Sequence, residues 1–120
     1  MSDSELNEIA KRWFLAFNNK DLKSLLSLYD DNAEHFSPKL KVLHPETNGL
    51  IKGQKALQSW WQDAFNRLPS LRYTIVRLTP HDNRVFMEYI RHVNGEDDLF
   101  VGEMLEIQSG LIIKSSVFHQ

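Results

Sequence analysis

One carboxylate interrupts an apolar row near the end of this 120-residue chain. The stretch "LFVGEMLEIQ" predicts a β-strand over residues 98–108, because apolar residues recur at every second position. Side chains alternate between the two faces of a strand, so Glu103 shares a face with apolar neighbours. These neighbours are Leu99, Val101, Leu105 and Ile107. Burial among them would favour the neutral acid, which can donate a hydrogen bond to a ligand oxygen or exchange a proton.

Two alternatives for Glu103 remain open. It could form a structural ion pair with Arg77 or Arg91 on a neighbouring strand. It could also share a proton with Glu88, if an even number of residues closes the turn "NGED". An odd number would bring Met87 and Tyr89 to the same face instead, and Glu88 could then pair with Arg77. A three-residue turn, "QSG", would add four residues of the last strand to the face of Glu103. These are Ile113, Ser115, Val117 and His119.

His35 is the second residue whose type could do chemistry near neutral pH. It lies two positions before Ser37 in a short strand candidate, "AEHFS", so the two side chains point the same way. A histidine here could act as a base, or could simply be hydrogen-bonded near the surface. His35, His44, His119 and Glu103 could together hold a metal, but no two of them have a tight ligand spacing. We therefore expect no metal.

Three helices are expected to position these residues. Residues 2–19 have apolar side chains at intervals of three and four, and Ser2 with Glu5 forms a capping box. A short helix over 22–29 and a third over 54–68 follow the same pattern. Between the last two helices, residues 38–53 hold two prolines and two glycines, which predicts a long functional loop or lid.

The second half of the chain predicts a β-meander. The strand candidates are 71–79, 84–93, 98–108 and 111–119, separated by turn-forming residues. Helices followed by an antiparallel sheet define the α+β class, and residues 1–120 fit a single domain.

Composition excludes several functions. The net charge of −2 offers no attraction for nucleic acid or an anionic membrane. The chain has no cysteine, no long apolar segment and an acidic start, so we expect a soluble, cytoplasmic protein. No phosphate loop or dinucleotide fingerprint occurs, so we expect no nucleotide or redox cofactor.

Four segments carry a family resemblance. They are "FLAFNNKDLKSLLSLYDDNAEHFSP", "IKGQKALQSWWQDAFNRLPSLRYTI", "DNRVFMEYIRHV" and "VGEMLEIQSGLIIKSSVFH". Together they cover most of the chain, which resembles the SnoaL-like proteins of the nuclear transport factor 2-like superfamily. That superfamily includes ketosteroid isomerase and polyketide cyclases. The resemblance implies a cone-shaped fold, in which a curved sheet wraps around the helices and leaves a pocket at one end. It also implies a homodimer through the convex face of the sheet.

The resemblance can be carried over residue by residue. Ser37 falls at the position of the general-base aspartate, and Trp13 at that of the tyrosine of the oxyanion hole. Glu103 falls at the position of a protonated aspartate that donates a hydrogen bond. Only Glu103 keeps the chemistry, since serine needs its own activator to serve as a base. Steroid isomerisation by that mechanism is therefore not expected.

These observations predict a mostly apolar pocket for a small organic molecule. Glu103 would be the acid or oxyanion donor and His35 the base, in a proton transfer, isomerisation, cyclisation or dehydration. The remaining pocket residues are expected to be Trp13, Phe17, Ser37, Trp61, Tyr73, Glu88 and His119. Lys39 or Lys52 at the mouth could meet an anionic ligand. The alternatives are a binding module without turnover and a dimerisation module.

Overall fold

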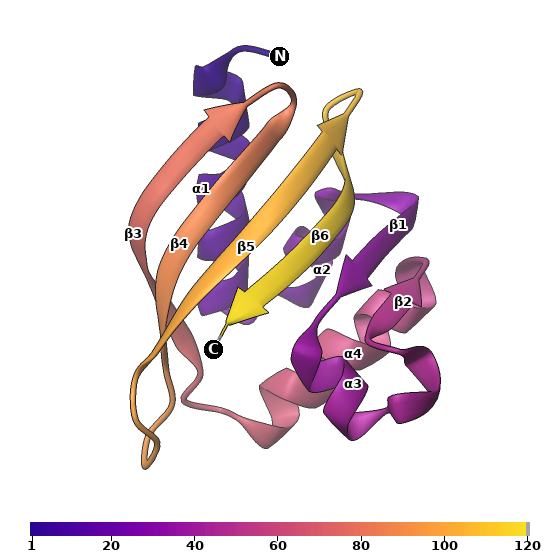
Figure 1. Ribbon diagram of the computed structural model, residues 1–120, viewed down its shortest axis with the longest axis vertical. Coiled ribbons are helices and arrows are strands. Elements are labelled where there is room, and N and C mark those ends of the chain that lie inside the picture. The colour runs from indigo at the N-terminus through magenta and orange to yellow at the C-terminus, as the bar shows by residue number, and fades with distance from the viewer. Residues whose placement is uncertain (120) are drawn as a thin grey trace.

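Six strands form one curved, open sheet in the computed structural model, which describes the backbone of residues 1–119 and the side chains of residues 1–118 (Figure 1). The strands are β1 (Tyr29–Phe36), β2 (Leu50–Lys52), β3 (Arg72–His81), β4 (Arg84–His92), β5 (Leu99–Gln108) and β6 (Leu111–His119). Their spatial order is β2-β1-β6-β5-β4-β3. Strands β1 and β6 are parallel, and the other neighbours are antiparallel. The α+β class predicted from the sequence is confirmed.

Helices cover one face of this sheet. They are α1 (Asp3–Asn18), α2 (Leu22–Ser27), α3 (Pro38–Leu43) and α4 (Gln54–Arg67), with a short 3₁₀ turn, η1 (Pro45–Thr47). Helix α1 lies against β3 and β4, whereas α4 lies beside β1 and β2 (Figure 1). The predicted capping box is present, because Ser2 Oγ accepts from the Glu5 amide at 3.1 Å and the Glu5 carboxylate accepts from the Ser2 amide at 3.0 Å. The hydrophobic core therefore lies between the helices and the concave face of the sheet.

Residues 38–53 are more regular than the sequence predicted, so the expectation of a long loop is wrong. This segment contains α3, η1 and β2. Ser37 Oγ accepts a hydrogen bond from the Lys39 amide and caps α3, and Pro38 occupies the first turn, where its missing N–H has no cost. Gly49 has φ +86°, and a Cβ there would lie 2.9 Å from the ring of Phe36, so the entry into β2 requires glycine.

The β4–β5 register places Glu88 away from Glu103, which corrects the expected pocket role of Glu88. Arg91 pairs with Leu99, so an odd number of residues lies between the paired positions. Met87 therefore pairs with Glu103, and Tyr89 follows on the same face, while Glu88 pairs with Gly102 on the opposite face.

The last hairpin brings Ser115 and Val117 to the face of Glu103, as predicted, but by a different turn. Only Ser109 and Gly110 lie between the paired ends of β5 and β6, and both have positive φ. A bulge after Glu106 then shifts the register. As a result Ile112 is fully buried, whereas Ile113, which was expected on this face, is only partly buried.

Candidate functional site

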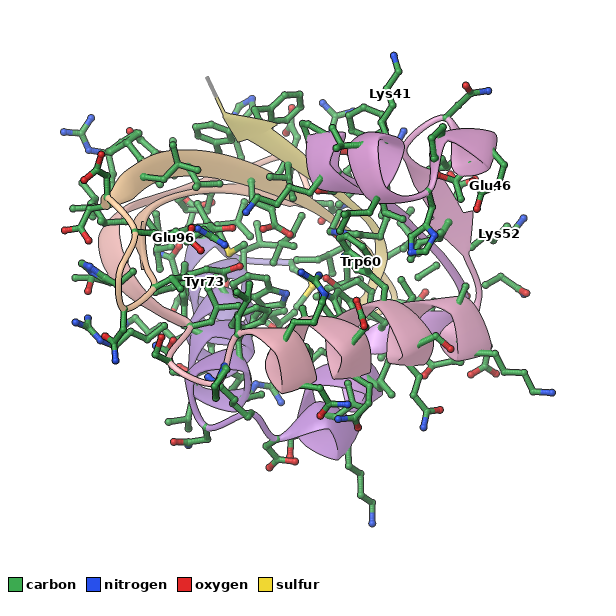
Figure 2. All side chains as sticks on the ribbon, turned by 90° about the horizontal axis from the view of Figure 1, so that it is seen from below. Lys41, Glu46, Lys52, Trp60, Tyr73 and Glu96 are labelled. Atoms are coloured by element: carbon green, nitrogen blue, oxygen red, sulfur yellow. The ribbon has the colours of Figure 1, made fainter. Side chains whose placement is uncertain are left out.

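A cavity of about 360 Å³ lies between the concave face of the sheet, α3 and α4. Figure 2 looks toward this end of the molecule, with Trp60 of α4, Tyr73 of β3 and Glu96 of the β4–β5 connection around the space. Its lining includes most of the predicted site residues, namely Trp13, Phe17, His35, Ser37, Trp61, Tyr73 and Glu103. Glu88 does not line it, and the side chain of His119 lies outside the described residues.

Glu103 is the buried carboxylate of this cavity. It is only 2% exposed, and the Tyr89 hydroxyl donates to its Oε1 at 2.7 Å. Its Oε2 is buried and has no hydrogen-bond partner among the described residues. Burial raises the pKa of Glu103 to about 7, although the hydrogen bond from Tyr89 acts in the opposite direction. Both protonation states are therefore populated near neutral pH.

Among the described residues, Glu103 does not form the ion pair with an arginine that was one of the expected alternatives. Arg91 lines the cavity, but its Nη1 contacts Glu96 Oε1 at 3.0 Å. Arg77 is exposed on β3. Glu103 is therefore held by a neutral phenol rather than by a cation.

Stacked aromatic rings fix the position of the Tyr89 hydroxyl. The ring of Tyr73 lies 4.3 Å from those of Tyr89 and Phe17, and Trp13 stacks on Phe17 at 5.2 Å. The side-chain amide of Asn18 fixes the backbone of Tyr73. It accepts from the Tyr73 N–H at 2.8 Å and donates to the Tyr73 carbonyl at 2.9 Å. Burial raises the pKa of Tyr89 well above its ordinary value, so its hydroxyl stays protonated and donates to Glu103.

A directional chain of hydrogen bonds ends at His35. The Trp13 indole donates to the Tyr29 hydroxyl at 3.1 Å, and Tyr29 donates to Ser115 Oγ at 3.0 Å. Ser115 Oγ lies 2.6 Å from His35 Nδ1. Because an indole N–H can only donate, the Tyr29 hydroxyl accepts from Trp13 and passes its own hydrogen to Ser115 Oγ. The direction of the last bond depends on the tautomer of His35: Ser115 donates to Nδ1 when the imidazole hydrogen resides on Nε2, and accepts from Nδ1 in the other tautomer.

His35 is a neutral imidazole in the cavity wall. Burial lowers its pKa to about 4, so it carries no charge near neutral pH. In the tautomer whose Nδ1 accepts from Ser115, the remaining ring nitrogen, Nε2, has a hydrogen to donate. The indole N–H of Trp13, which the family resemblance places at the position of an oxyanion donor, is engaged in the same chain through its hydrogen bond to Tyr29.

Three residues of the site had no predicted role in it. Ser115 was expected on the face of Glu103, but its partner could not be known without the parallel pairing of His35 with Ser115. Tyr29 was expected at the end of a helix and instead begins β1. Tyr89 was one of two alternatives that depended on the turn length, and the register decides in its favour.

The mouth of the cavity is charged. Lys39, Arg67, Arg91 and Glu96 line it, together with Val42 and Leu43 of α3. Arg67 contacts Asp63 at 2.7 Å, and Arg91 contacts Glu96 at 3.0 Å. Burial lowers the pKa of the Lys39 amine, and the nearby positive charge of Arg91 lowers it further. The mouth thus holds more cations than acids.

The described residues form neither a metal-binding cluster nor a membrane-spanning helix. Within residues 1–118, no three acidic or histidine side chains lie together in a way that could hold a metal ion. His44 is exposed, with its Nδ1 3.6 Å from Glu46 Oε1 and its ring edge-on to that of Trp60. In the described part of the chain, no helix has the length and hydropathy needed to cross a membrane.

Comparisons with known proteins agree with this architecture. A SnoaL-like protein of unknown function from Burkholderia thailandensis has a TM-score of 0.89 at 19% identity, over 100% of this chain and 98% of that one. A proposed polyketide cyclase from Sinorhizobium meliloti has a TM-score of 0.80 at 14% identity, over 98% and 100%. A protein with a ketosteroid isomerase-like fold from Catenulispora acidiphila, in complex with trimethylamine, has a TM-score of 0.77 at 14% identity, over 94% and 85%.

At these identities the structural matches establish the fold alone. None of the curated proteins matches this chain. The sequence model of the SnoaL-like domain matches residues 10–114, which is most of the chain. The chain therefore belongs to the SnoaL-like domain family.

Proposed function

We propose that the cavity binds a small, mostly apolar organic molecule and that Glu103 moves a proton next to a carbonyl group of that molecule. The observation that carries this proposal is Glu103 Oε2, a buried carboxyl oxygen in the cavity wall without a protein partner. Buried polar atoms are normally paired, so an unpaired one at a cavity suggests that a ligand completes it. The SnoaL-like family and the similarity to a proposed polyketide cyclase support the same class of reaction.

The roles follow from the protonation states. With a pKa of about 7, Glu103 can accept a proton from the carbon next to a ketone and return it to another atom of the resulting enolate. The neutral imidazole of His35 would donate its Nε2 hydrogen to the ketone oxygen as negative charge develops there. In this proposal Glu103 is the base and His35 the donor, which reverses the roles expected from the sequence.

The apolar wall serves this chemistry by excluding water. Trp13, Phe17, Trp61 and Tyr73 line the cavity around the two polar groups. A dry site keeps the pKa of Glu103 high and strengthens the hydrogen bond from His35 to a developing oxyanion. Isomerisation, cyclisation and dehydration all begin with such a proton transfer.

A second candidate function is binding without turnover. Ser37 stands at the position where the resemblance places an aspartate base, and its Oγ accepts from the Lys39 amide as the cap of α3. Ser37 is thus engaged in structure rather than in proton transfer. Glu103 could then act only as a hydrogen-bonding group for an oxygen of the ligand.

The variant Glu103→Gln separates the two functions. We would measure the exchange of hydrogen for deuterium next to the carbonyl of 1-phenylpropan-2-one in D₂O by proton NMR, together with its binding. If Glu103 transfers the proton, the variant should lose at least about 100-fold in exchange rate and keep its affinity. Glu88→Gln, on the opposite face of the sheet, is the matched control and should match the wild type. Binding by the wild type without accelerated exchange would favour the binding module.

We further propose a homodimer through the outer face of the sheet. Phe100 and Phe118 are 55% and 53% exposed, and the pairing of Phe118 with Gly102 puts both rings on the face opposite Glu103. Exposed aromatic rings on one sheet face are typical of a surface that another chain covers. Sedimentation of the wild type and of Phe118→Ser tests this, since the variant should sediment as a monomer.

A further inference from the structure

We infer that the ligand of this cavity carries an anionic group, of the carboxylate class, which pairs with Lys39 at the mouth while the carbonyl end reaches Glu103. This inference rests on the proposed function and adds the chemical class of the ligand to it.

The charges around the mouth are unbalanced. Three cations line it, Lys39, Arg67 and Arg91. Arg67 is paired with Asp63 and Arg91 with Glu96. Among the described side chains, Lys39 forms no ion pair. One positive charge is therefore left without a protein partner, which matches a singly charged anion.

The location of Lys39 makes this unpaired charge costly. Burial and the nearby charges of Arg91 and Arg67 disfavour the charged form of Lys39, and the carboxylate of Glu96 offsets them only in part. A further counter-charge would therefore stabilise the partly buried cation. Ser37 caps α3 through the backbone amide of Lys39, whose side chain lines the cavity.

The space between the two ends of the cavity is apolar. Trp60, Leu99 and Val101 lie among its lining residues, along with the stacked rings near Glu103. A ligand that spans it would have an anionic group at the mouth, an apolar body and an oxygen at the buried end. A volume of about 360 Å³ is within the range of small-molecule pockets.

A pair of probes that differ only in charge tests the inference. We would measure the binding of 4-oxo-4-phenylbutanoate and of its methyl ester by isothermal titration calorimetry. The acid should bind about tenfold more tightly than the ester, because a hydrogen-bonded ion pair is formed only with the acid. Lys39→Met should reduce the affinity for the acid to that for the ester, and Lys39→Arg should restore the preference.

Lys41→Met is the matched control. Lys41 lies on the same helix, is exposed, and points away from the cavity in Figure 2. This variant has the same net charge as Lys39→Met, so it should keep the tenfold preference. An equal loss in the two variants would mean general electrostatic attraction and would overturn the inference.

The outcomes also separate this inference from the proposed function. Equal affinities of the wild type for the acid and the ester would overturn the anionic ligand and leave the pocket proposal standing. No binding of either probe at millimolar concentration would overturn both. A preference for the acid that persists in Glu103→Gln would show that the mouth acts independently of the carboxyl group at the buried end.

Discussion

Tyr89 and Glu103 lie on neighbouring antiparallel strands, and the phenol donates to one carboxyl oxygen at 2.7 Å while the other oxygen has no described partner. This contact favours the ionised form of Glu103, whereas burial favours the neutral form more strongly. The balance between the two sets a pKa of about 7 and allows one residue both to accept and to return a proton.

The first prediction concerns Tyr89→Phe. Removing the hydroxyl removes the one group that stabilises the carboxylate, so the pKa of Glu103 should rise above 7. Loss of a hydrogen bond of typical strength to the carboxylate should lower the acid dissociation constant of Glu103 about tenfold. Carbon-13 NMR titration of the side-chain carboxyl would measure it, with Glu103→Gln to assign the signal. A titration midpoint that falls or stays constant would contradict this account of the pKa.

The second prediction concerns stability against pH. The pKa of Glu103 is about 7 in the folded state, against an ordinary value of 4.5. Between these values Glu103 binds more protons in the folded state than in the unfolded state. The free energy of unfolding therefore decreases as pH rises from about 4.5 to about 7. The full cost at higher pH is about 3 kcal/mol. Urea unfolding of Glu103→Gln should therefore show a gain in stability over the wild type that grows between pH 5 and 8.

His35 changes the pH dependence of stability in the opposite direction. Its pKa is lowered to about 4 from an ordinary 6.5, so it contributes stability that is present above about 6.5 and is lost as pH falls toward 4. The two effects oppose each other between about 4.5 and 6.5. In Glu103→Gln the acid-side loss of stability should therefore become steeper than in the wild type. An unchanged slope over this range would show that one of the two groups is not shifted as described.

The third prediction concerns Ser115→Ala. The serine hydroxyl connects Tyr29 to His35, and its removal leaves the buried Tyr29 hydroxyl without an acceptor and the buried His35 Nδ1 without a partner. Each such group costs about 1–3 kcal/mol, so unfolding by urea should show a loss of at least that size. Ser116→Ala, on the opposite face of the same strand, is the control and should cost less than about 0.5 kcal/mol. Similar losses in both variants would argue against the buried chain.

The fourth prediction concerns the cap of α3. Ser37→Ala should lose about 1 kcal/mol of stability, because the Lys39 amide loses its acceptor. Ser37→Asp should retain stability, since aspartate is an equally good cap. Urea unfolding of the two variants measures the difference, and equal losses would mean that the hydroxyl is not needed as a cap.

The part of the site that could be predicted depended on strand alternation. The apolar row around Glu103 and the inward positions of Ser115 and Val117 follow from a period of two, which local sequence contains. The choice between Glu88 and Tyr89 depended on whether an odd or an even number of residues separates paired positions. Composition does not reveal that number, because several turn lengths fit the same polar residues.

The segment 38–53 shows a different kind of failure. Its prolines and glycines were interpreted as marks of a loop, but Pro38 begins a helix that Ser37 caps, and Gly49 and Gly53 lie just outside the short strand β2. The roles of Tyr29 and Ser115 depended on the parallel pairing of β1 with β6. Such pairing joins residues 80 or more positions apart, and no local pattern records it.

The hydrogen-bond chain from Trp13 to His35 also limits how protons can travel. An indole cannot accept a hydrogen bond, so this chain is closed at Trp13 and cannot conduct a proton to the surface. Glu103 has Tyr89 as its only described partner, and that phenol stays protonated. In the proposed reaction, Glu103 can therefore exchange its proton with water only through the mouth of the cavity. Exchange with D₂O should be slower than the transfer of the proton within one bound molecule, so a substrate deuterated at the reacting carbon should keep part of its label in the product.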